Sequence, residues 1–439
     1  MSSNDPLNQI TALSRPSREN QARGKQYKPR GAPTGAKSNL APIFLFPTTQ
    51  NRQDTAAMRP SWRTVECETR QPVRTASHTT VERFYYISTK IPELRLAGRY
   101  QQAYKTSNTI KRQKMDSNVF NLLVEYSTQA PSGHNTQPWK FENIQDGIII
   151  HPDFTRALPI VDADNHALFI SLGCAVENLV IAASKKGYES IVNYPDDPNG
   201  AITVNHYKPD ANNHTADDLF DFIKTRQVTR NKYTNRRVED TELETLRTSF
   251  NFEGVSVIFL NNKENFEKII PLIIQGNNLQ FQNKQFVNEL TNWFRYTKSE
   301  AEKTKDGLWT AGMGLPNMGR LIGNLIMKNF VSAKSESKRI EDILQHTAGI
   351  AIFISEKNDV ISWTNVGRAF QRFGLTATKL GICHAHLNMP CEEISVRKKL
   401  AKALGLYQKH PLLLIRYGYA EKMPYSFRRT AEDVIIKTK

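Results

Sequence analysis

The sequence has no apolar run near the roughly 20 residues that a helix needs to span a bilayer. Its longest apolar stretches, such as APIFLF and PLLLI, are far shorter, and no charged-then-apolar leader follows Met1. Cysteine is also scarce: the 4 cysteines are Cys67, Cys174, Cys383 and Cys391, without CxxC spacing. This pattern argues against a disulfide framework and is typical of a reducing compartment, so we expect a cytoplasmic protein without a membrane partner.

Several motifs that would assign an activity are absent as well. The sequence contains no GxSxG, no P-loop and no GxGxxG, so it gives no support to a hydrolase, an ATPase or a Rossmann dehydrogenase. It has no HxxxH pair and no Cys/His set with the spacing of metal ligands, so we expect no metal site.

Positive charge is abundant but unevenly placed. The formal net charge is +16, and residues 1–114 hold 20 of the 59 Lys and Arg but only 7 of the 43 Asp and Glu. These first 114 residues show no sustained periodicity and predict a disordered basic extension, and one interpretation is that it lies outside the native protein. The alternatives are an acid-poor targeting peptide and a basic arm for nucleic acid, and we rank a nucleic-acid binder last among the functions. Met115 and the capping Asp116 then resemble a natural chain start.

Strands and helices alternate after Met115, which predicts a mixed α and β domain. The runs that predict strands are Gly147–His151, Ile202–Tyr207, Val255–Leu260, Gly349–Ser355 and Pro411–Gly418. Helical periodicity covers Phe120–Tyr126, His166–Lys186, Ala216–Lys224, Glu239–Thr248, Asn277–Phe294, Ile361–Leu380 and Glu392–Leu404.

Two of these helices match each other without gaps. Gly173–Gly187 aligns on Gly367–Gly381 with identical Gly, Ala and Lys at five positions. The match indicates either a duplicated unit, in which one chain imitates a dimer, or two buried helices with generic small residues at close contacts.

The segment Ala130–Trp139, APSGHNTQPW, lies between a helix and a strand-like stretch. Gly and Pro fix the turn, which leaves Ser132, His134, Asn135 and Gln137 to offer donors and acceptors. Such a loop suits the polar edge of a flat heteroaromatic ligand. The same residues could instead cap the helix and seat Trp139 in the core.

A second segment, Thr225–Leu246, is rich in basic side chains and threonines. Guanidinium groups and a short hydroxyl are what a phosphate monoester requires. From spacing alone, an exposed basic linker is the favoured alternative.

At Ala130–Trp139 the sequence resembles the FMN-dependent nitroreductase family, whose members carry an APS-x-x-N-x-Q-P-W loop. It is more closely similar to the large single-chain branch with two fused nitroreductase-like halves. The segments that carry this likeness are HTAGIAIFIS from His346, WTNVGRAFQRFGLTATKLGI from Trp363 and RYGYAEKMPYSFRRTAEDVI near the end. The resemblance covers residues 115–439 and none of 1–114.

The resemblance implies an α+β, nitroreductase-like fold in which two similar halves form an internal pseudo-dimer after the extension. Residues 115–224 would form the first half, with the APSGHNTQPW loop. Residues 225–439 would form the second half, with the phosphate-binding opening and the C-terminal arginines. The chain would work as a monomeric pseudo-dimer or a homodimer, with one flavin per chain.

Nitroreductases open with an R-x-S/T-x-R stretch that holds the FMN phosphate. The preferred register here is Lys232, Thr234 and Arg236, and a looser one uses Arg226 and Arg230 with Thr229. The resemblance also implies a backbone approach to the flavin ring at Gly381-Ile382, where a helix C-cap is the structural alternative. The implied cofactor-binding residues are Pro131, Ser132, Gly133, Asn135, Gln137, Arg230, Thr234, Asn235, Arg236, Gly381, Ile382, Arg428 and Arg429.

The resemblance therefore implies an oxidoreductase that passes electrons from NADH or NADPH through FMN to a nitroaromatic, a quinone or a similar small acceptor. The flavin carries the chemistry, so no side chain is expected to be catalytic. The alternative is a non-catalytic protein that binds or stores FMN, with the Gly- and Met-rich segment between Phe281 and Lys338 as a lid over it.

Overall fold

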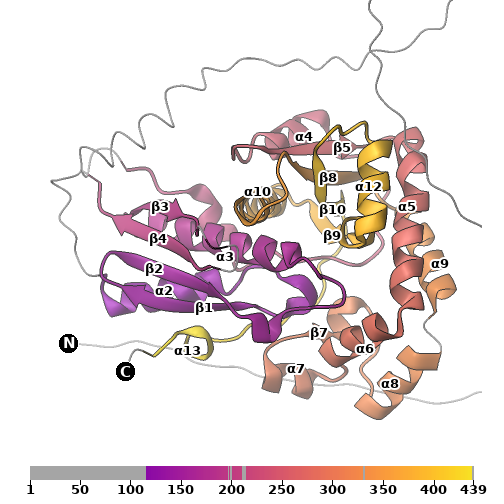
Figure 1. Cartoon of the computed structure of the whole chain (residues 1–439), viewed down its shortest axis with the longest axis horizontal. Coiled ribbons are helices and arrows are strands. Elements are labelled where there is room, and N and C mark those ends of the chain that lie inside the picture. Colours follow the sequence, from indigo (N-terminus) through magenta and orange to yellow (C-terminus); the bar gives the residue numbers. More distant parts are fainter. Residues whose placement is uncertain (1–114, 196, 198–199, 210–213, 330–331, 438–439) are drawn as a thin grey trace, which may run out of the picture. The chain divides into compact units, whose positions relative to one another are not determined.

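The computed structural model describes residues 115–437, except 196, 198–199, 210–213 and 330–331 (Figure 1). The expectation of a disordered extension at 1–114 lies outside the described residues. Helices and antiparallel sheets are both present, as the α+β prediction requires.

The first sheet follows helix α2 (Ser117–Ser127). The side chain of Asp116 caps the N-terminus of this helix by accepting from the backbone N–H groups of Asn118 and Val119. Its strand order is β1-β2-β4-β3, and every neighbouring pair is antiparallel. Ile202 and Val204 alternate with less buried residues along β4, because one face of the sheet meets the core. The strands are β1 (Trp139–Ile144), β2 (Gly147–Pro152), β3 (Glu189–Asn193) and β4 (Ile202–Tyr207).

The second sheet follows helix α4 (Asp240–Arg247) and repeats this plan. Its order is β5-β8-β10-β9, and every neighbouring pair is again antiparallel. In both sheets, the four strands numbered along the chain therefore lie in the spatial order first, second, fourth, third. Strand β8 is buried along its whole length. The strands are β5 (Val255–Leu260), β8 (Gly349–Ser355), β9 (Cys383–His386) and β10 (His410–Gly418).

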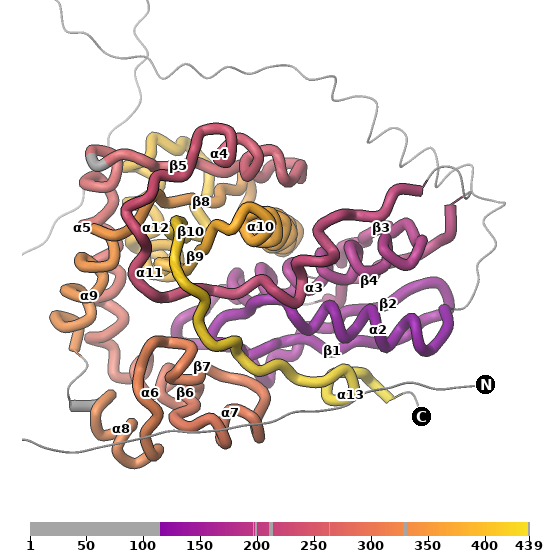
Figure 2. The backbone as a smooth tube through the Cα atoms, turned by 180° about the vertical axis from the view of Figure 1, so that it is seen from behind, coloured from indigo at the N-terminus to yellow at the C-terminus, as the bar shows by residue number. Residues whose placement is uncertain are grey.

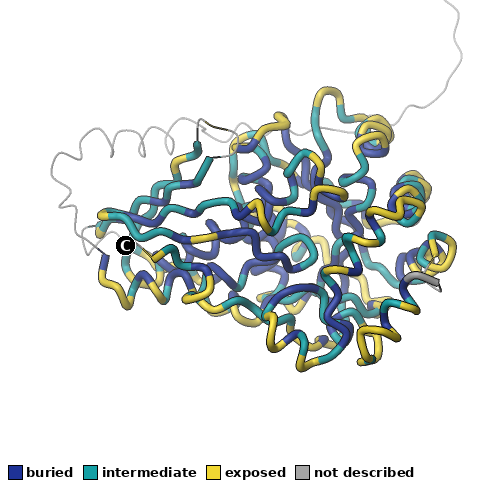
Figure 3. The backbone as a smooth tube through the Cα atoms, turned by 60° about the horizontal axis from the view of Figure 1, so that its bottom comes forward, coloured by how far each residue is buried: buried dark blue, intermediate teal, exposed yellow. Residues whose placement is uncertain are grey.

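In the sequence, one long helix connects the second strand of each sheet to the third. In space, these two helices pack against each other between the sheets (Figure 1). They are α3 (His166–Lys185) and α10 (Val360–Lys379). At their crossing, a β-carbon on Gly173 would lie 2.1 Å from the carbonyl oxygen of Thr364. Helix α3 is long and apolar enough to cross a membrane, but most of its residues are buried inside the protein as core (Figure 3).

The main insertion relative to the first sheet lies between β5 and β8, where the first sheet has only a short turn between β1 and β2. Its helices stand beside the second sheet and extend below it (Figures 1 and 2). The inserted elements are α5 (Lys263–Gln282), α6 (Lys284–Trp293), β6 (Phe294–Arg295), α7 (Lys298–Thr304), β7 (Leu308–Trp309), η5 (Thr310–Met313), α8 (Arg320–Asn329) and α9 (Ala333–Gln345).

The last segment returns from the second sheet to the first. After β10 the chain runs along the molecule to α13 (Ala431–Val434) (Figure 2). Ile435 then forms a parallel bridge with Phe141 of β1. Two short helices, α11 (Met389–Glu392) and α12 (Ile394–Ala403), connect β9 to β10. The remaining single turns of 3₁₀ helix are η1 (Gly133–Asn135), η2 (Phe154–Arg156) and η4 (Asp218–Phe222).

The predicted strands are confirmed, three of them with the same bounds: Ile202–Tyr207, Val255–Leu260 and Gly349–Ser355. Three helix predictions were wrong in part. Ala216–Lys224 forms only the 3₁₀ turn η4, and the chain breaks between α11 and α12 at Glu393. The helix expected at Asn277–Phe294 begins earlier, at Lys263, because α5 tolerates Pro271 and Gly276, and it ends at Gln282 before α6 starts.

Candidate functional site

A cavity of about 270 Å³ lies where the two sheets, the two central helices and the insertion meet. Its wall combines residues far apart in the sequence, and the APSGHNTQPW loop and the basic segment both reach it. The lining residues are Pro131, Ser132, Gly133, His134, Ala167, Ile170, Ser171, Cys174, Arg230, Gln280, Phe286, Leu308, Met313, Arg339, Ile343, Phe370, Ala385, His386, Leu387, Asn388, Met389, Glu392, Leu413 and Arg416.

The loop reaches the cavity in an unusual backbone conformation. His134, Asn135 and Gln137 all have positive φ, at 48°, 55° and 54°, which non-glycine residues rarely adopt. The Ser132 hydroxyl accepts from the backbone N–H of Gln137 at 2.9 Å and so closes the turn. The fully buried Trp139 anchors the end of the loop in the core. The positive-φ conformation of the loop is therefore stabilised by the Ser132–Gln137 hydrogen bond and by the buried Trp139 side chain.

Arg230 and Arg416 bring positive charge to the cavity. Arg416 is 1% exposed, its guanidinium carbon lies 3.8 Å from the Tyr233 ring centroid, and its Nη2 donates to the carbonyls of Arg230 and Asn231. Burial lowers the pKa of Arg230 to about 10, with Arg339 and Arg416 adding to the effect. Both guanidiniums stay charged near neutral pH, so the wall is cationic.

Two more guanidinium groups, those of Arg226 and Arg428, are buried near the cavity without lining it. Arg226 is 4% exposed, and its Nε and Nη1 have no hydrogen-bond partner. Burial, and then Arg226, lower the pKa of Arg428 to about 9, and the Nε of Arg428 is also unpartnered. Among the described ion pairs, none joins a carboxylate to Arg226, Arg230, Arg416 or Arg428. Buried cations without counter-ions favour an anionic ligand.

Three histidines surround the same region in neutral form. Burial, and then Arg230, lower the pKa of His134 to about 4, and burial with Arg230 and Arg226 lowers that of His386 to about 3. His384 lies edge-on to Phe370, and neither of its ring nitrogens has a partner. These imidazoles can act as hydrogen-bond donors or acceptors at neutral pH, but they add no charge.

The preferred phosphate register lies on the outside of the protein. Thr234, Asn235 and Arg236 are exposed and do not line the cavity. Arg236 stacks on Tyr419 with its guanidinium carbon 4.0 Å from the ring centroid, and Lys232 pairs with Asp342. The looser register is the one that faces inward, since Arg226, Thr229 and Arg230 all approach the buried cluster.

Gly381 and Ile382 end helix α10 instead of lining the cavity. Gly381 has φ of 73°, its N–H donates to Thr378, and the N–H of Ile382 donates to Ala377 at 2.7 Å. These are the bonds of a helix C-cap. Both backbone donors that the resemblance assigns to a flavin ring are therefore occupied within the protein.

Asn135, Gln137 and Arg429 hold the final segment in place. Asn135 donates from Nδ2 to the carbonyls of Gly307 and Phe427, and its Oδ1 accepts from Arg428. Gln137 accepts from the backbone N–H of Arg429 at 2.8 Å, and Arg429 returns a bond to the carbonyl of Gln137. None of these side chains lines the cavity, so they position the loop and the C-terminal arginines from behind.

Sequence reasoning missed several residues of the cavity wall, chiefly Arg416, Arg339 and Glu392. Arg416 stands inside the apolar strand PLLLIRYG, where a lone arginine in a buried strand is itself a signal, since such a charge needs a partner. Arg339 and Glu392 lie on α9 and α11, far along the chain from either motif, and no local pattern marks them.

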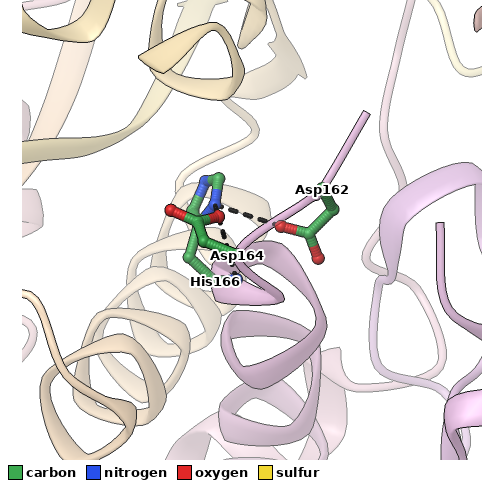
Figure 4. A group of neighbouring side chains, drawn as sticks. All are labelled: Asp162, Asp164 and His166. Atoms are coloured by element: carbon green, nitrogen blue, oxygen red, sulfur yellow. Dashed lines mark hydrogen bonds and ion pairs between the residues drawn. The ribbon is translucent and has the colours of Figure 1, made fainter. Parts of the chain in front are cut away.

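A cluster at the start of α3 has the composition of a cation site: Asp162, Asp164 and His166 (Figure 4). Its carboxylates are already engaged. The side chain of Asp162 accepts from the backbone N–H groups of Ala167 and Leu168, and Asp164 pairs with Arg397 at 3.0 Å. We therefore interpret the cluster as the cap of α3 and its ion pair with α12.

Comparison with curated proteins gives two relatives, both from Mycobacterium tuberculosis, strains CDC 1551 and H37Rv. Each is 23% identical over 331 residues, which cover 73% of this chain and 92% of the relative, and each is provisionally named an NAD(P)H nitroreductase. The chain is similar in sequence to these NAD(P)H nitroreductases. This confirms the resemblance to nitroreductases stated from the APSGHNTQPW loop, of which Pro131, Ser132, Gly133 and His134 line the cavity. No family model matches the chain.

Solved structures of nitroreductases are also similar to this chain. A nitroreductase with bound FMN from Bacteroides fragilis is 14% identical, with a TM-score of 0.29, over 51% of this chain and 94% of that one. The FMN-dependent nitroreductase NfnB from Mycobacterium smegmatis, in complex with NADPH, is 14% identical, with a TM-score of 0.31, over 46% and 86%.

Proposed function

We propose that this nitroreductase relative is an FMN-dependent oxidoreductase that passes electrons from NADH or NADPH to a nitroaromatic, a quinone or a similar small acceptor. One observation carries the proposal: Pro131–His134 of the APSGHNTQPW loop and Arg230 of the basic segment line a single cavity. The names of the two mycobacterial relatives and their near full-length coverage support the reductant and the reaction class.

The residues present fit FMN. Arg226, Arg416 and Arg428 carry buried guanidinium nitrogens without partners, and a phosphate dianion supplies both the missing charge and several acceptor oxygens. The loop Pro131–His134 and the apolar side chains of Ile170, Phe370 and Leu413 offer a mixed polar and apolar wall for a flat ring. We assign phosphate binding to the register Arg226–Arg230 and to Arg416, with Arg428 in support.

When bound, FMN supplies hydride chemistry that no side chain provides. The chain then has three tasks. Arginines fix the phosphate, the strained loop fixes one edge of the ring, and the insertion, through Phe286, Leu308 and Met313, shields the cavity from water. His134 and His386 are placed to exchange hydrogen bonds with a ligand in neutral form.

We also propose the division into halves at residues 115–224 and 225–439, as an internal pseudo-dimer. The equal strand order of the two sheets supports it, as does the position of α3 and α10 within each sheet. In this arrangement the loop comes from the first half and the phosphate-binding arginines from the second. The chain would then be a monomeric pseudo-dimer or a homodimer of such chains, in the cytoplasm.

A non-catalytic FMN-binding or storage protein is the second candidate. The observation that favours it is the insertion itself, because three residues of the expected lid, Phe286, Leu308 and Met313, line the cavity. A wall of this kind protects a flavin and also restricts access to it.

The visible spectrum of the purified protein, with FMN added, tests the proposal. We expect the two absorption bands of oxidised flavin, which bleach on adding NADH or NADPH without oxygen and return with a quinone. Failure to take up FMN overturns the proposal. Bleaching by dithionite but by neither nicotinamide would favour the storage protein instead.

A further inference from the structure

Glu392 is a carboxyl group in the cavity wall that FMN binding does not use. It is the last residue of α11 and lines the cavity together with Gln280, Asn388 and Met389. The arginines of the cavity lie on other elements: Arg230 in the basic segment, Arg339 on α9 and Arg416 on β10. The cavity therefore has guanidinium groups and one carboxyl group of its own.

Two amide side chains hold this carboxyl group, and none of the ion pairs among the described residues includes it. Its Oε2 accepts from the Nε2 of Gln280 at 2.7 Å, and its Oε1 accepts a longer bond, 3.3 Å, from the Nδ2 of Asn388. Asn388 is itself fixed, since its Oδ1 accepts from the backbone N–H of Leu414. The longer bond leaves Oε1 as the oxygen that can carry a proton.

Burial favours the neutral acid, and it outweighs the surrounding amide bonds and charges. Burial raises the pKa of Glu392, and the nearby Asp162 adds to this, while the amide bonds and His166 oppose it. The neighbouring Glu393, between α11 and α12, is also acidic, and its pKa is raised by burial and by Glu392. Arg397 of α12 pairs with Asp164, and Arg416 of β10 donates to backbone carbonyls.

The other titratable groups of the cavity are poor acids near neutral pH. His134 and His386 are already neutral because their pKa values are lowered, and burial raises the pKa of the Cys174 thiol to about 12. Guanidinium groups do not give up their protons in this range. Among the titratable groups lining the cavity, Glu392 is the one suited to donate a proton.

We propose that Glu392 donates the proton that accompanies hydride transfer to an acceptor bound in this cavity. The proposal rests on the proposed function. For a quinone, the hydride equivalent comes from NADH or NADPH through the flavin and forms one new bond to the acceptor. The proton from Glu392 adds to the acceptor as the O–H bond of its carboxyl group breaks. The products are the hydroquinone and the carboxylate, which water reprotonates.

The test compares two acceptors with different proton needs. The FMN-loaded protein is reduced with dithionite without oxygen and mixed rapidly with menadione, a quinone, or with ferricyanide, which takes electrons without protons. We expect Glu392→Gln to slow the menadione reaction about 100-fold, as the loss of a general acid typically does. The ferricyanide reaction should stay within about twofold. Glu393→Gln, the matched control, lies outside the cavity lining and should leave both rates unchanged.

The pH profile and an infrared spectrum separate proton donation from a structural role. The wild-type menadione rate should fall as pH rises through the pKa of Glu392, and Glu392→Gln should lack this fall. The infrared spectrum of the FMN-loaded protein near neutral pH should show a protonated carboxyl band that Glu392→Gln loses and Glu393→Gln keeps. The inference is overturned if Glu392→Gln slows the menadione and ferricyanide reactions equally, or if it slows neither. Failure of the wild type to take up FMN overturns the proposed function as well.

Discussion

Gly173 and Gly367 contact each other reciprocally where α3 crosses α10. A β-carbon on either glycine would lie 3.0 Å from the Cα of the other. These two positions are equivalent in the alignment of Gly173–Gly187 with Gly367–Gly381. Mutual contact between equivalent residues is the geometry of a two-fold axis, as in an isologous dimer interface. The contact therefore favours the internal pseudo-dimer.

Substitution of either glycine tests how tightly this crossing is packed. In Gly173→Ala the new methyl would lie 2.1 Å from the carbonyl oxygen of Thr364, and in Gly367→Ala 2.0 Å from that of Ile170. Both backbones must shift, so we expect each variant to lose about 1–3 kcal/mol of unfolding free energy in urea titrations. Gly319→Ala, which meets nothing within 4 Å, is the control. Unchanged stability in both variants would contradict close packing.

The two candidate phosphate registers predict opposite mutational results. Arg230 lines the cavity, whereas Arg236 is exposed on Tyr419. Arg230→Ala should weaken FMN binding by about 10–100-fold, because a charge-assisted hydrogen bond contributes about 1.5–3 kcal/mol. Arg236→Ala should change it less than about threefold. Fluorescence titration of FMN into the apoprotein measures both, and the reverse order would restore the outer register.

The two C-terminal arginines should differ in the same assay. Arg428 has a buried, unpartnered Nε near Arg226, while Arg429 donates to the backbone carbonyls of Gln137 and Asp433. We expect Arg428→Met to weaken FMN binding and Arg429→Met to lower the thermal midpoint with little effect on affinity. Equal affinities for Arg428→Met and the wild type would remove Arg428 from the phosphate site.

Glu177 links α3 to α10 by two ion pairs, with Arg368 at 2.8 Å and Arg372 at 2.9 Å, and is 2% exposed. The two guanidiniums overcome its burial and hold its pKa below the usual value. Glu177→Gln should cost about 3 kcal/mol in urea, since it leaves buried charge uncompensated. Glu244→Gln, which breaks the exposed pair with Arg247, should cost less than about 1 kcal/mol. Similar losses in the two variants would contradict a special role for Glu177.

The buried histidines make the apoprotein sensitive to acid. His384 is 1% exposed and its pKa lies well below 6.5 because of burial, with Arg226 and His386 adding to the effect. The unfolded chain takes up this proton near pH 6.5 and the folded protein does not. Stability is therefore complete above about pH 6.5 and falls as pH decreases, by about 1.4 kcal/mol per pH unit for this group. Urea titrations of His384→Gln from pH 7 to 5 should show a correspondingly shallower slope.

The sequence carried enough information for three strands of the second sheet, the two central helices and the loop, but not for β9. Strands such as Val255–Leu260 are short apolar runs with clear ends. The similarity of α3 and α10 can be seen by aligning their amino-acid sequences. Helix α5 was harder, because Pro271 and Gly276 are helix breakers whose cost is met only by tertiary packing. Such packing is invisible in a single sequence.

The choice between the two phosphate registers depends on burial, which motif spacing does not reveal. Lys232, Thr234 and Arg236 were chosen by motif spacing, yet the buried Tyr233 lies between them. In an extended segment alternate residues point to the same side, so a buried Tyr233 turns its neighbours outward. Motif spacing does not show which side chain is buried, so the sequence did not decide between the two registers. It did not predict the position of Glu392 either, because that position depends on how α11 meets α5.

The bonds between the APSGHNTQPW loop and the final segment have a consequence for biosynthesis. Asn135 and Gln137 depend on Phe427 and Arg429 for their hydrogen bonds, and Ile435 completes the edge of β1. A ribosome makes the loop early, but its partners emerge about 290 residues later. The loop therefore gains these contacts only after residue 429 has been made, and a nascent chain stalled before residue 427 carries the loop without them.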